Sequence, residues 1–497
     1  MGQINKVLIA NRGEIAVRII RTCKERGIGT VAIYSDVDQL SPHVLIADES
    51  VPLEGISSTD TYLNQNKVIE AARLTESDAI HPGYGFLSEN ASFARRCSEE
   101  GFIFIGPSPE SIEMMGDKTR ARELIAKSGV PYPPGSKSEI SNIEEGKKIA
   151  DQIGYPVLIK AAAGGGGKGM RIIHEPDSFE AGFKTARSEA KNAFGDERVF
   201  VEKYLEEPRH IEFQIFADQS GKTVHLFERE CSIQRRHQKV VEEAPSPIID
   251  SKLRAMMADA AISVAKSCKY TGAGTVEFMV DRDKKFYFLE MNTRLQVEHP
   301  VTEMITGLDL VGLQIDVANG KPLPFSQKDV QQRGHAIECR IYAEDSMNQF
   351  LPSTGLLLRH RIPSGPGVRV DAGIEEGGEV SIHYDPMISK LTVHAADRDQ
   401  AIRKMLRALS EYEIGGVQTT IPFCKFVLNS KSFIEGEYDT HFVQDNYKPE
   451  EIKENKDALD PIAVVSSFIK MNKQNQSNEP VINGNQDIGG WWKIRKR

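Results

Sequence analysis

The chain has 497 residues, and 71 acidic against 62 basic side chains give it a formal net charge of −9. General nucleic-acid binding requires a basic face, so this charge disfavours a nucleic-acid partner. With 40% hydrophobic and 27% charged residues, the composition excludes disorder as the main state.

Length and cysteine usage narrow the class of protein further. At roughly 150 residues per domain the length predicts about three domains. No stretch approaches the roughly 20 continuous apolar residues of a membrane span, so no membrane partner is expected. The N-terminus shows no signal-peptide pattern. Six scattered cysteines without a CxxC pair indicate reduced thiols, no cysteine-ligated zinc and a cytoplasmic location.

Short apolar runs alternate with helical patterns over the first 110 or so residues. Residues 7–10, 31–34, 79–80 and 102–105 predict four strands, and the pattern over 15–20 predicts a helix. Buried strands separated by helices favour a parallel sheet with crossover connections. The Pro- and Gly-rich segment 129–135 predicts a boundary.

The pattern changes between about residues 155 and 300, where strands come in pairs joined by short polar turns. This predicts a largely antiparallel sheet, interrupted by helices at 176–192 and 251–269. Short strands recur from about 333 to 400, followed by a helix at 397–412. Beyond Tyr447 the chain is mostly polar, which predicts a flexible tail.

A glycine-rich segment, Gly-Gly-Gly-Gly-Lys-Gly, occupies residues 164–169. It fits GxGxxG, but a dinucleotide fold needs a helix after the loop, and here strand-like runs flank both sides. The P-loop pattern also fails, because no Ser or Thr follows Lys168. We predict a hairpin loop whose backbone amides cover phosphate oxygens, with a hairpin tip without ligand as the alternative. Lys160 in the preceding strand favours a ligand.

A series of polar residues occupies alternate positions near residue 290. In an extended strand they would share one face and span roughly 27 Å, comparable to a nucleoside triphosphate plus a second substrate. The five residues are Glu290, Asn292, Arg294, Gln296 and Glu298.

Two acids of this region are predicted to face each other. If Asp281 pairs with Phe286, then Glu277 lies opposite Glu290, with Cβ atoms about 5 Å apart. Two such carboxylates repel unless a cation or proton lies between them. With Asn292 they form an all-oxygen set that suits Mg²⁺ or Mn²⁺. The alternative is the solvent face of an amphipathic hairpin, and a one-residue slip would separate the two acids.

Two further segments alternate in the same way, His210 to Ile215 and Ile337 to Tyr342. Residues 232–239 form a compact basic loop that can gather anions. For His210 and His237 taken singly, a polar surface histidine is the alternative.

Several long motifs resemble one family. From about residue 4 to 447 the chain resembles biotin carboxylase, an ATP-grasp ligase. The motifs that carry the resemblance are 9–16 (Ile-Ala-Asn-Arg-Gly-Glu-Ile-Ala), 81–90, 116–118, the glycine loop, 234–245, 290–300 and 350–355.

The resemblance implies a fold of mixed class, α/β and α+β. An N-terminal parallel α/β domain would cover 1–112, and an ATP-grasp domain 113–330 with a mobile lid at about 131–205. A C-terminal mixed β domain would cover 331–447, and the flexible polar tail 448–497.

The resemblance also implies a two-step reaction. ATP phosphorylates bicarbonate to carboxyphosphate, and the CO₂ is then placed on N1′ of biotin. The segment Ile469-Lys470-Met471 lacks the first Met of the Met-Lys-Met setting of biotinyl lysines, and too few residues follow it for a biotinyl domain. The implied partners are therefore a biotin carboxyl carrier protein and a carboxyltransferase subunit in trans, with a homodimer expected. Acetyl-CoA, propionyl-CoA and pyruvate are all possible final acceptors.

The family's site residues map onto matching positions. Glu298 matches the base that deprotonates bicarbonate, and Arg340 matches the residue that stabilises the biotin enolate. Lys239, Arg294, Gln296 and Val297 match bicarbonate-site positions, and Glu277, Glu290 and Asn292 match ligands of Mg²⁺ or Mn²⁺. ATP contacts are implied for Lys118, Lys160, Gly165, Gly166, Gly167, Lys168, Gly169, Glu202, Lys203 to Leu205 against the adenine, His210, Gln234 and His237.

Elementary chemistry fits these roles. Bicarbonate is a small planar anion that suits the guanidinium fork of Arg294. A carboxylate at Glu298, beside Arg294 and Lys239, should stay ionised near pH 7. The alternatives are another ATP-grasp ligase that joins a carboxylate to an amine, and a non-catalytic nucleotide-binding subunit.

Overall fold

A parallel sheet of five strands, in the order β3-β2-β1-β4-β5, is formed by the N-terminal residues. The computed structural model describes residues 3–136, 138–162, 169–236 and 238–449, without the side chains of residues 118 and 119. The predicted parallel sheet is confirmed, but β3 was not predicted, because its residues are mostly exposed and form no apolar run. The strands are β1 Lys6–Ile9, β2 Gly29–Tyr34, β3 Glu49–Pro52, β4 Ala79–His81 and β5 Ile103–Phe104.

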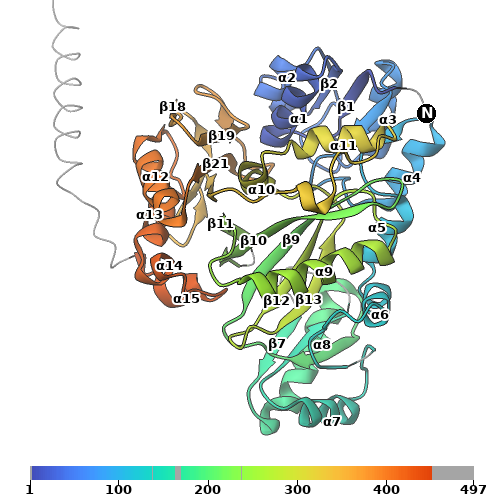
Figure 1. The fold of residues 1–497 in the computed structure, drawn as a ribbon, viewed down its shortest axis with the longest axis vertical. Helices are drawn as coiled ribbons and strands as arrows, with labels where there is room; N and C mark the ends of the chain where they lie inside the picture. Colours follow the sequence, from blue (N-terminus) through green and yellow to red (C-terminus); the bar gives the residue numbers. More distant parts are fainter. Residues whose placement is uncertain (1–2, 137, 163–168, 237, 450–497) are drawn as a thin grey trace, which may run out of the picture. The chain divides into compact units, whose positions relative to one another are not determined.

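Helices cover both faces of this sheet (Figure 1). Alternate residues of β1 belong to two different cores: Val7 and Ile9 pack with α1, whereas Leu8 packs with α3 and α4. The side chains of Asn64 and Asn90 accept hydrogen bonds at the N-termini of α3 and α4. The helices of this region are α1 Gly13–Glu25, α2 Pro42–Ile46, α3 Gln65–Leu74, α4 Ala91–Glu99, α5 Pro109–Gly116 and α6 Lys118–Lys127.

An antiparallel sheet of eight strands, β13-β12-β9-β10-β11-β14-β21-β19, forms the centre of the structure. This confirms the predicted antiparallel pairing over 155–300. The sheet continues past residue 330, because β11 pairs with β14. Its strands are β9 Arg209–Ala217, β10 Thr223–Arg235, β11 Gln238–Ala244, β12 Gly272–Val280, β13 Phe286–Asn292, β14 His335–Tyr342, β19 Val368–Ala372 and β21 Met387–Ala395.

Helices pack against the central sheet on several sides (Figure 1). The predicted helices at 251–269 and 397–412 are observed as α9 Ser251–Ser267 and α12 Arg398–Glu411. The others are α10 His299–Thr306, α11 Leu310–Ala318, α13 Ile421–Asn429, α14 Lys431–Glu435 and α15 Phe442–Asn446. Short strands complete the C-terminal part: β15 Glu344–Asp345, β16 Leu351–Pro352, β17 Gly355–Leu356, β18 Arg359–Arg361, β20 Glu379–Val380 and β22 Glu413–Gly415.

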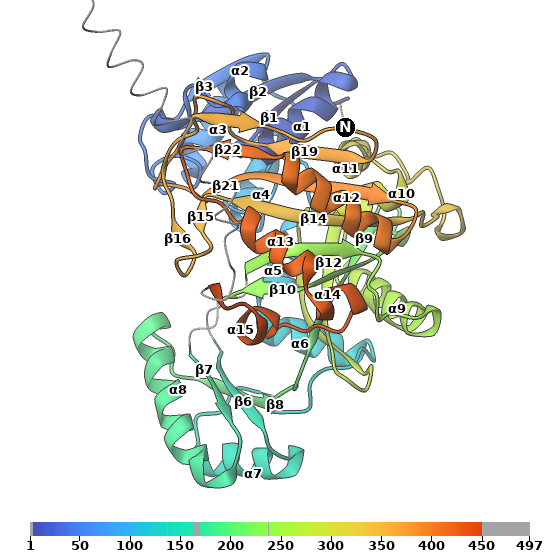
Figure 2. The ribbon, with the colours of Figure 1, turned by 90° about the vertical axis from the view of Figure 1, so that its left-hand side faces the viewer.

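A small lobe of three antiparallel strands, in the order β7-β6-β8, lies below the central sheet in Figure 2. It has its own core, built around Phe179 and Phe183. The antiparallel pairing of β6 with β7 confirms the hairpin predicted around the glycine loop. Its elements are β6 Val157–Ala161, β7 Met170–Ile173, β8 Val199–Lys203, α7 Ile143–Ile153 and α8 Phe179–Phe194.

Two further observations concern cysteines and membranes. All six cysteines are free and buried. Within the described ranges, no helix combines the length and apolar character needed to cross a bilayer.

The separate core of the small lobe is testable. Phe183 is 1% exposed and stacks on Phe179 with ring centroids 5.7 Å apart. Phe183→Ala should destabilise the lobe by about 3–5 kcal/mol, because it leaves a cavity. Hydrogen exchange should accelerate in β6, β7 and α8 but not in the central sheet. Ile172→Ala, at a 43% exposed position of the same lobe, is the control, and equal protection in both variants would contradict a separate core.

Candidate active site

The candidate site contains two glutamates that face each other on neighbouring strands. Glu277 on β12 pairs directly with Glu290 on β13, as predicted. The premise of that prediction was wrong, because Val280 rather than Asp281 pairs with Phe286. Asp281 instead accepts backbone hydrogen bonds within the turn. A bulge between Glu277 and Phe278 leaves Leu289 as an extra residue and restores the predicted pairing.

The extended strand predicted through Glu298 is not observed. Strand β13 ends at Asn292, and α10 begins at His299. Glu89, before α4, accepts hydrogen bonds from the backbone N–H of Thr293 and from Arg294 Nε, both at 2.9 Å. These bonds draw the chain out of the sheet, so the roughly 27 Å face predicted from strand geometry does not form.

Three acids lie in a row across neighbouring strands. Glu290 pairs with Glu277, and Glu277 pairs with Glu212 on β9. The buried cations Arg229 and Lys239 offset this charge: Lys239 Nζ donates to Glu212 at 2.6 Å and to Glu277 at 3.0 Å. Burial alone would raise the pKa of Glu277, but Lys239 and then His210, whose Nε2 lies 2.9 Å from Glu277 Oε2, hold that pKa well below its usual range.

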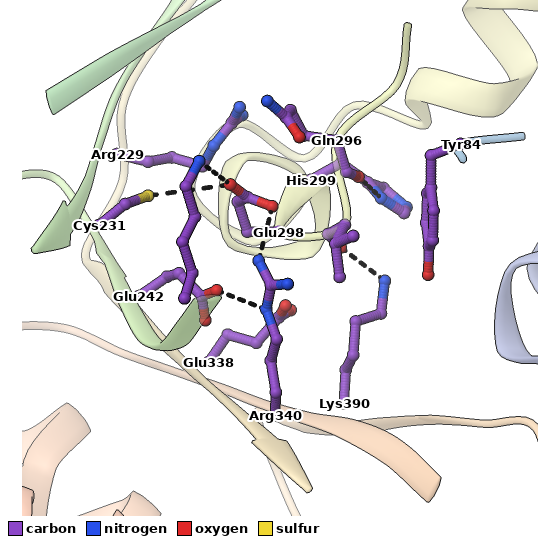
Figure 3. Close-up of polar contacts among 12 residues, drawn as sticks. Tyr84, Arg229, Cys231, Glu242, Gln296, Glu298, His299, Glu338, Arg340 and Lys390 are labelled. Carbon is purple, nitrogen blue, oxygen red and sulfur yellow. Dashed lines mark hydrogen bonds and ion pairs between the residues drawn. The ribbon is translucent and has the colours of Figure 1, made fainter. Parts of the chain in front are cut away.

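Glu298 lies at the centre of the site, at the N-cap of α10 (Figure 3). Its carboxylate is 1% exposed and accepts from Lys239 Nζ at 2.7 Å and Arg340 Nη2 at 2.9 Å. Burial alone would raise the pKa of Glu298, but Lys239, then Arg340 and Arg229, hold it well below its usual range. Glu298 is therefore ionised at neutral pH, as expected.

Arg294 is not the direct partner of Glu298. Its guanidinium instead donates to Glu89, to Gln296 at 2.8 Å and to Asn292 at 3.1 Å. The cations that touch Glu298 are Lys239 and Arg340. Arg294 is half-buried at the edge of the cluster, where an incoming anion can reach it.

The backbone carbonyl of Val297 is held by Lys390 of β21, whose Nζ donates to it at 2.6 Å. Lys390 is fully buried and also pairs with Glu14 of α1 at 3.2 Å. In Figure 3 Lys390 lies beside Arg340 and points toward the loop that carries Val297. The loop before α10 is thus tied to both the N-terminal sheet region and the C-terminal strands.

The acid pair fits a divalent cation. Among the described residues, no hydrogen bond or ion pair engages the Glu290 carboxylate, whose side chain is exposed. Glu277, Glu290 and the Asn292 amide offer only oxygen ligands, which Mg²⁺ prefers. Atoms of His210, Glu212 and Glu277 also lie within 4.8 Å of one another. Lys239 already occupies that position with its ammonium group, so the outer pair fits an ion better.

The candidate ATP residues form a second group, in and beside the small lobe. Lys160 pairs with Glu202 at 2.7 Å, and Arg122 also contacts Glu202. Lys203 Nζ donates to the carbonyls of Gly154 and Tyr155 at 3.1 and 2.9 Å.

The other candidate ATP residues lie next to strands of the small lobe and on the central sheet. Gly169 directly precedes β7 and has φ +69°, and Leu205 is half-buried just after β8. On the central sheet, Gln234 Nε2 lies 2.7 Å from His210 Nδ1. Gly165, Gly166, Gly167, Lys168, His237 and the Lys118 side chain lie outside the described residues.

Sequence reasoning assigned no role to several buried charges of the site. Glu212 and Glu338 stood in alternating segments, but the pattern does not tell which charges meet in space. The unassigned buried residues are Glu14, Glu212, Arg229, Glu242, Glu338 and Lys390, and the exposed Glu89 also had no role assigned.

Comparison with known proteins accounts for almost the whole described chain. Residues 3–112 match the family model of the biotin carboxylase N-terminal domain, 117–326 that of the carbamoyl-phosphate synthase L chain ATP-binding domain, and 338–445 that of the biotin carboxylase C-terminal domain. The chain belongs to the biotin carboxylase family. This confirms the predicted ATP-grasp fold class and the predicted activity, an ATP-dependent ligase that carboxylates biotin with bicarbonate.

Individual relatives agree. Biotin carboxylase 1 of Bacillus subtilis is 52% identical over 89% of this chain and 98% of its own length. The biotin carboxylase of a Nostoc species is 51% identical over 90% of this chain and 100% of its own length. The biotin carboxylase domain dimer of 2-oxoglutarate carboxylase from Hydrogenobacter thermophilus, solved with MgADP, ADP and bicarbonate, is 46% identical. Its TM-score is 0.86, over 91% of this chain and 100% of that one.

The electrostatic role of Lys239 is testable through pH. Lys239→Met removes the first cation that depresses the pKa of Glu298, so that pKa should rise and the acidic limb of the kcat/KM profile should move to higher pH. A shift of about one pH unit or more is expected. Lys222→Met, whose ammonium group donates to the Leu323 carbonyl away from the site, should leave the limb in place. An unmoved limb in Lys239→Met would contradict this account of Glu298.

Proposed function

We propose that this chain is the biotin carboxylase subunit of a multisubunit carboxylase and that Glu298 is its general base. The observation that carries the proposal is the Glu298 carboxylate held between Lys239 and Arg340. One contact belongs to the proposed bicarbonate site and the other to the proposed biotin site, so the base stands between the two substrates.

Bicarbonate binding activates this base. A carboxylate with so low a pKa accepts a proton only when a cation moves away from it. Bicarbonate competes for that cation by bonding Lys239, Arg294 and Gln296 itself. Glu298 then takes the bicarbonate proton, as an oxygen of the bicarbonate attacks the terminal phosphorus of ATP to give carboxyphosphate and ADP.

Glu277, Glu290 and Asn292 would hold the divalent ion. When bound, it neutralises phosphate charge during phosphoryl transfer. Lys160, Glu202, His210 and Gln234 would bind the nucleotide, together with Lys118, His237 and the glycine loop. Lys203 to Leu205 would lie against the adenine. The distribution of these residues over the small lobe and the central sheet supports a nucleotide between the two.

Arg340 would stabilise the second step. Carboxyphosphate breaks its bond between carbon and the bridging oxygen to give CO₂ and phosphate. The phosphate takes the N1′ proton of biotin, which leaves the ureido group as an enolate, and N1′ then attacks CO₂ to give carboxybiotin. A guanidinium stays cationic at every working pH, so it can hold the enolate oxygen throughout.

The partners follow from this function. We infer a biotin carboxyl carrier protein and a carboxyltransferase subunit, both in trans, and a homodimer like the dimer named for the Hydrogenobacter domain. The matched structures include biotin carboxylase parts of a pyruvate carboxylase and of a 2-oxoglutarate carboxylase. Because similar chains occur with different acceptors, we infer that the transferase partner selects the final acceptor. A cytoplasmic location is supported by the six free, buried cysteines.

Two other functions explain less. Another ATP-grasp ligase of carboxylate and amine has no use for Arg340 beside Glu298. A non-catalytic subunit has no use for a complete set of acids and cations. ATP turnover that requires bicarbonate and increases with free biotin separates the proposed function from both.

The role of Arg340 gives one test. Arg340→Ala should bind ATP but lose at least about 10²-fold in carboxylation of biotin, as for loss of an oxyanion donor. Labelled bicarbonate measures carboxybiotin, and calorimetry measures ATP affinity. Arg361→Ala, whose exposed side chain pairs with Glu413 at 3.3 Å, is the control. Full carboxylation by Arg340→Ala would reject the assignment.

The proposed metal ligands give a second test of the function. Glu290→Gln should raise the Mg²⁺ concentration needed for half-maximal ATP turnover by about tenfold or more, since a charged ligand becomes neutral. A titration of activity with Mg²⁺ at saturating ATP measures this. Glu379→Gln, at a mostly exposed position of β20, is the control, and the same Mg²⁺ requirement in Glu290→Gln would remove this residue from the ion site.

A further inference from the structure

A second pair of opposed acids lies behind Arg340. Glu242 on β11 and Glu338 on β14 are direct cross-strand partners, and both side chains are fully buried. Glu242 Oε1 accepts from Arg340 Nε at 2.6 Å, and Glu338 Oε2 accepts from the Thr392 hydroxyl at 2.7 Å. Figure 3 shows both carboxylates flanking the Arg340 side chain, on the side away from Glu298.

Each acid has one oxygen without a partner. Among the described residues, Glu242 Oε2 and Glu338 Oε1 have no hydrogen-bond partner. A buried polar atom left without a partner is destabilising. One proton placed on either carboxylate supplies a donor to the other and removes the repulsion between two buried charges. Because the two residues are direct cross-strand partners, a proton held between their unpartnered oxygens would satisfy both.

We propose that Glu242 and Glu338 share one proton and together position Arg340 for the biotin enolate. Glu242, which accepts from Arg340 Nε, orients the guanidinium, while the shared proton keeps a second negative charge from neutralising it. The proposal rests on the proposed role of Arg340 and adds a positioning pair that does not itself touch substrate.

The titration of the acids agrees with this arrangement. Burial raises the pKa of Glu242 to about 8. The negative charge of Glu338 also raises this pKa, whereas the positive charge of Arg340 lowers it. Burial also raises the pKa of Glu338 to about 7, although the positive charge of Lys390 lowers it. Both shifts favour a protonated carboxyl near neutral pH, in agreement with a proton that the pair holds there and loses as the pH rises.

Other titratable and charged groups surround the pair, on every element packed against it. They are Lys239 on β11, Cys231 on β10, Cys339 and Tyr342 on β14, Lys390 on β21, Glu298 before α10, and Glu14, which reaches Lys390 from α1. Because Glu14 also has a pKa raised to about 7 by burial, the test includes a variant that isolates it.

Loss of the shared proton should weaken the stabilisation of the biotin enolate by Arg340. Above the pKa of the pair, two negative charges face one guanidinium, so stabilisation of the enolate falls and carboxylation declines on the alkaline side. In Glu338→Gln the amide donates to Glu242 and has no proton to lose. Its alkaline limb should move up by about one pH unit or more. Glu242→Gln removes the orienting charge, so carboxylation should fall about tenfold more than biotin-independent ATP turnover.

The experiment uses the full-length chain and covers pH values from about 6 to about 9. It measures kcat and KM for biotin, and separately the ATP turnover without biotin. Glu228→Gln is the matched control. Glu228 is a fully buried β10 acid bound to Arg254 at 2.6 and 2.8 Å, remote from Arg340 in its contacts. The Glu228→Gln variant should leave the pH profile unchanged, and the Glu14→Gln variant should leave the alkaline limb in place.

Each outcome decides the proposal. An alkaline limb that does not move in Glu338→Gln, or equal losses of both activities in Glu242→Gln, would overturn it. If Glu242→Gln does not fold, infrared difference spectra of the unmodified protein and Glu338→Gln replace it. A protonated-carboxyl band that is lost in the variant supports sharing, and no such band at neutral pH refutes it. If the unmodified protein carboxylates no biotin, the proposed function fails instead.

Discussion

One chain of buried ion pairs organises the active site. It runs from Glu277 through Lys239 to Glu298, and from Glu298 through Arg340 to Glu242. Each charge is satisfied by a neighbour of opposite sign, because an unpaired buried charge is strongly destabilising. The chain alternates acid and base, so any ligand that bonds one member changes the balance at the next. Substrate binding and base strength are coupled through these contacts.

The cost of this arrangement explains how the surrounding fold is built. Buried ion pairs gain little stability over apolar packing, so the charges persist only where the strands hold them in place. The central sheet supplies that rigidity through continuous antiparallel pairing from β13 to β19. Apolar residues of β9 and β12 pack beneath the charged face against α9. The polar face and the apolar core are therefore opposite sides of the same strands.

Sequence patterns predicted the elements of the fold better than the geometry of the site. Apolar runs and turn residues were enough for the parallel sheet, the antiparallel sheet, and the hairpin at the glycine loop. The opposition of Glu277 and Glu290 was predicted from a register that is offset by one residue, and the bulge at Leu289 corrected it. The departure of the chain after Asn292 depends on Glu89, more than 200 positions away.

A second irregularity shows the same limit. Between β10 and β11, Ile233 pairs with Val241 and Gln234 with Lys239, so Val240 is an extra residue. The bulge reverses the alternation of side chains, which turns Lys239 to the face that carries Glu242. Strict alternation along the sequence would have separated them. Both bulges change the register within a hairpin, which the alternation of residue types along the sequence does not reveal, so the pattern alone did not predict which charges converge.

Continuity of the sheet across residue 330 has a mechanistic consequence. Lys239 and Arg340 lie on β11 and β14, which are hydrogen-bonded neighbours, although they fall in separate predicted domains. Their separation is set by the sheet and is independent of any movement of the small lobe, whose strands form a different sheet. Glu298 therefore contacts two cations whose positions are set by the central sheet and not by the small lobe, so the charges that set its ionisation belong to the central sheet.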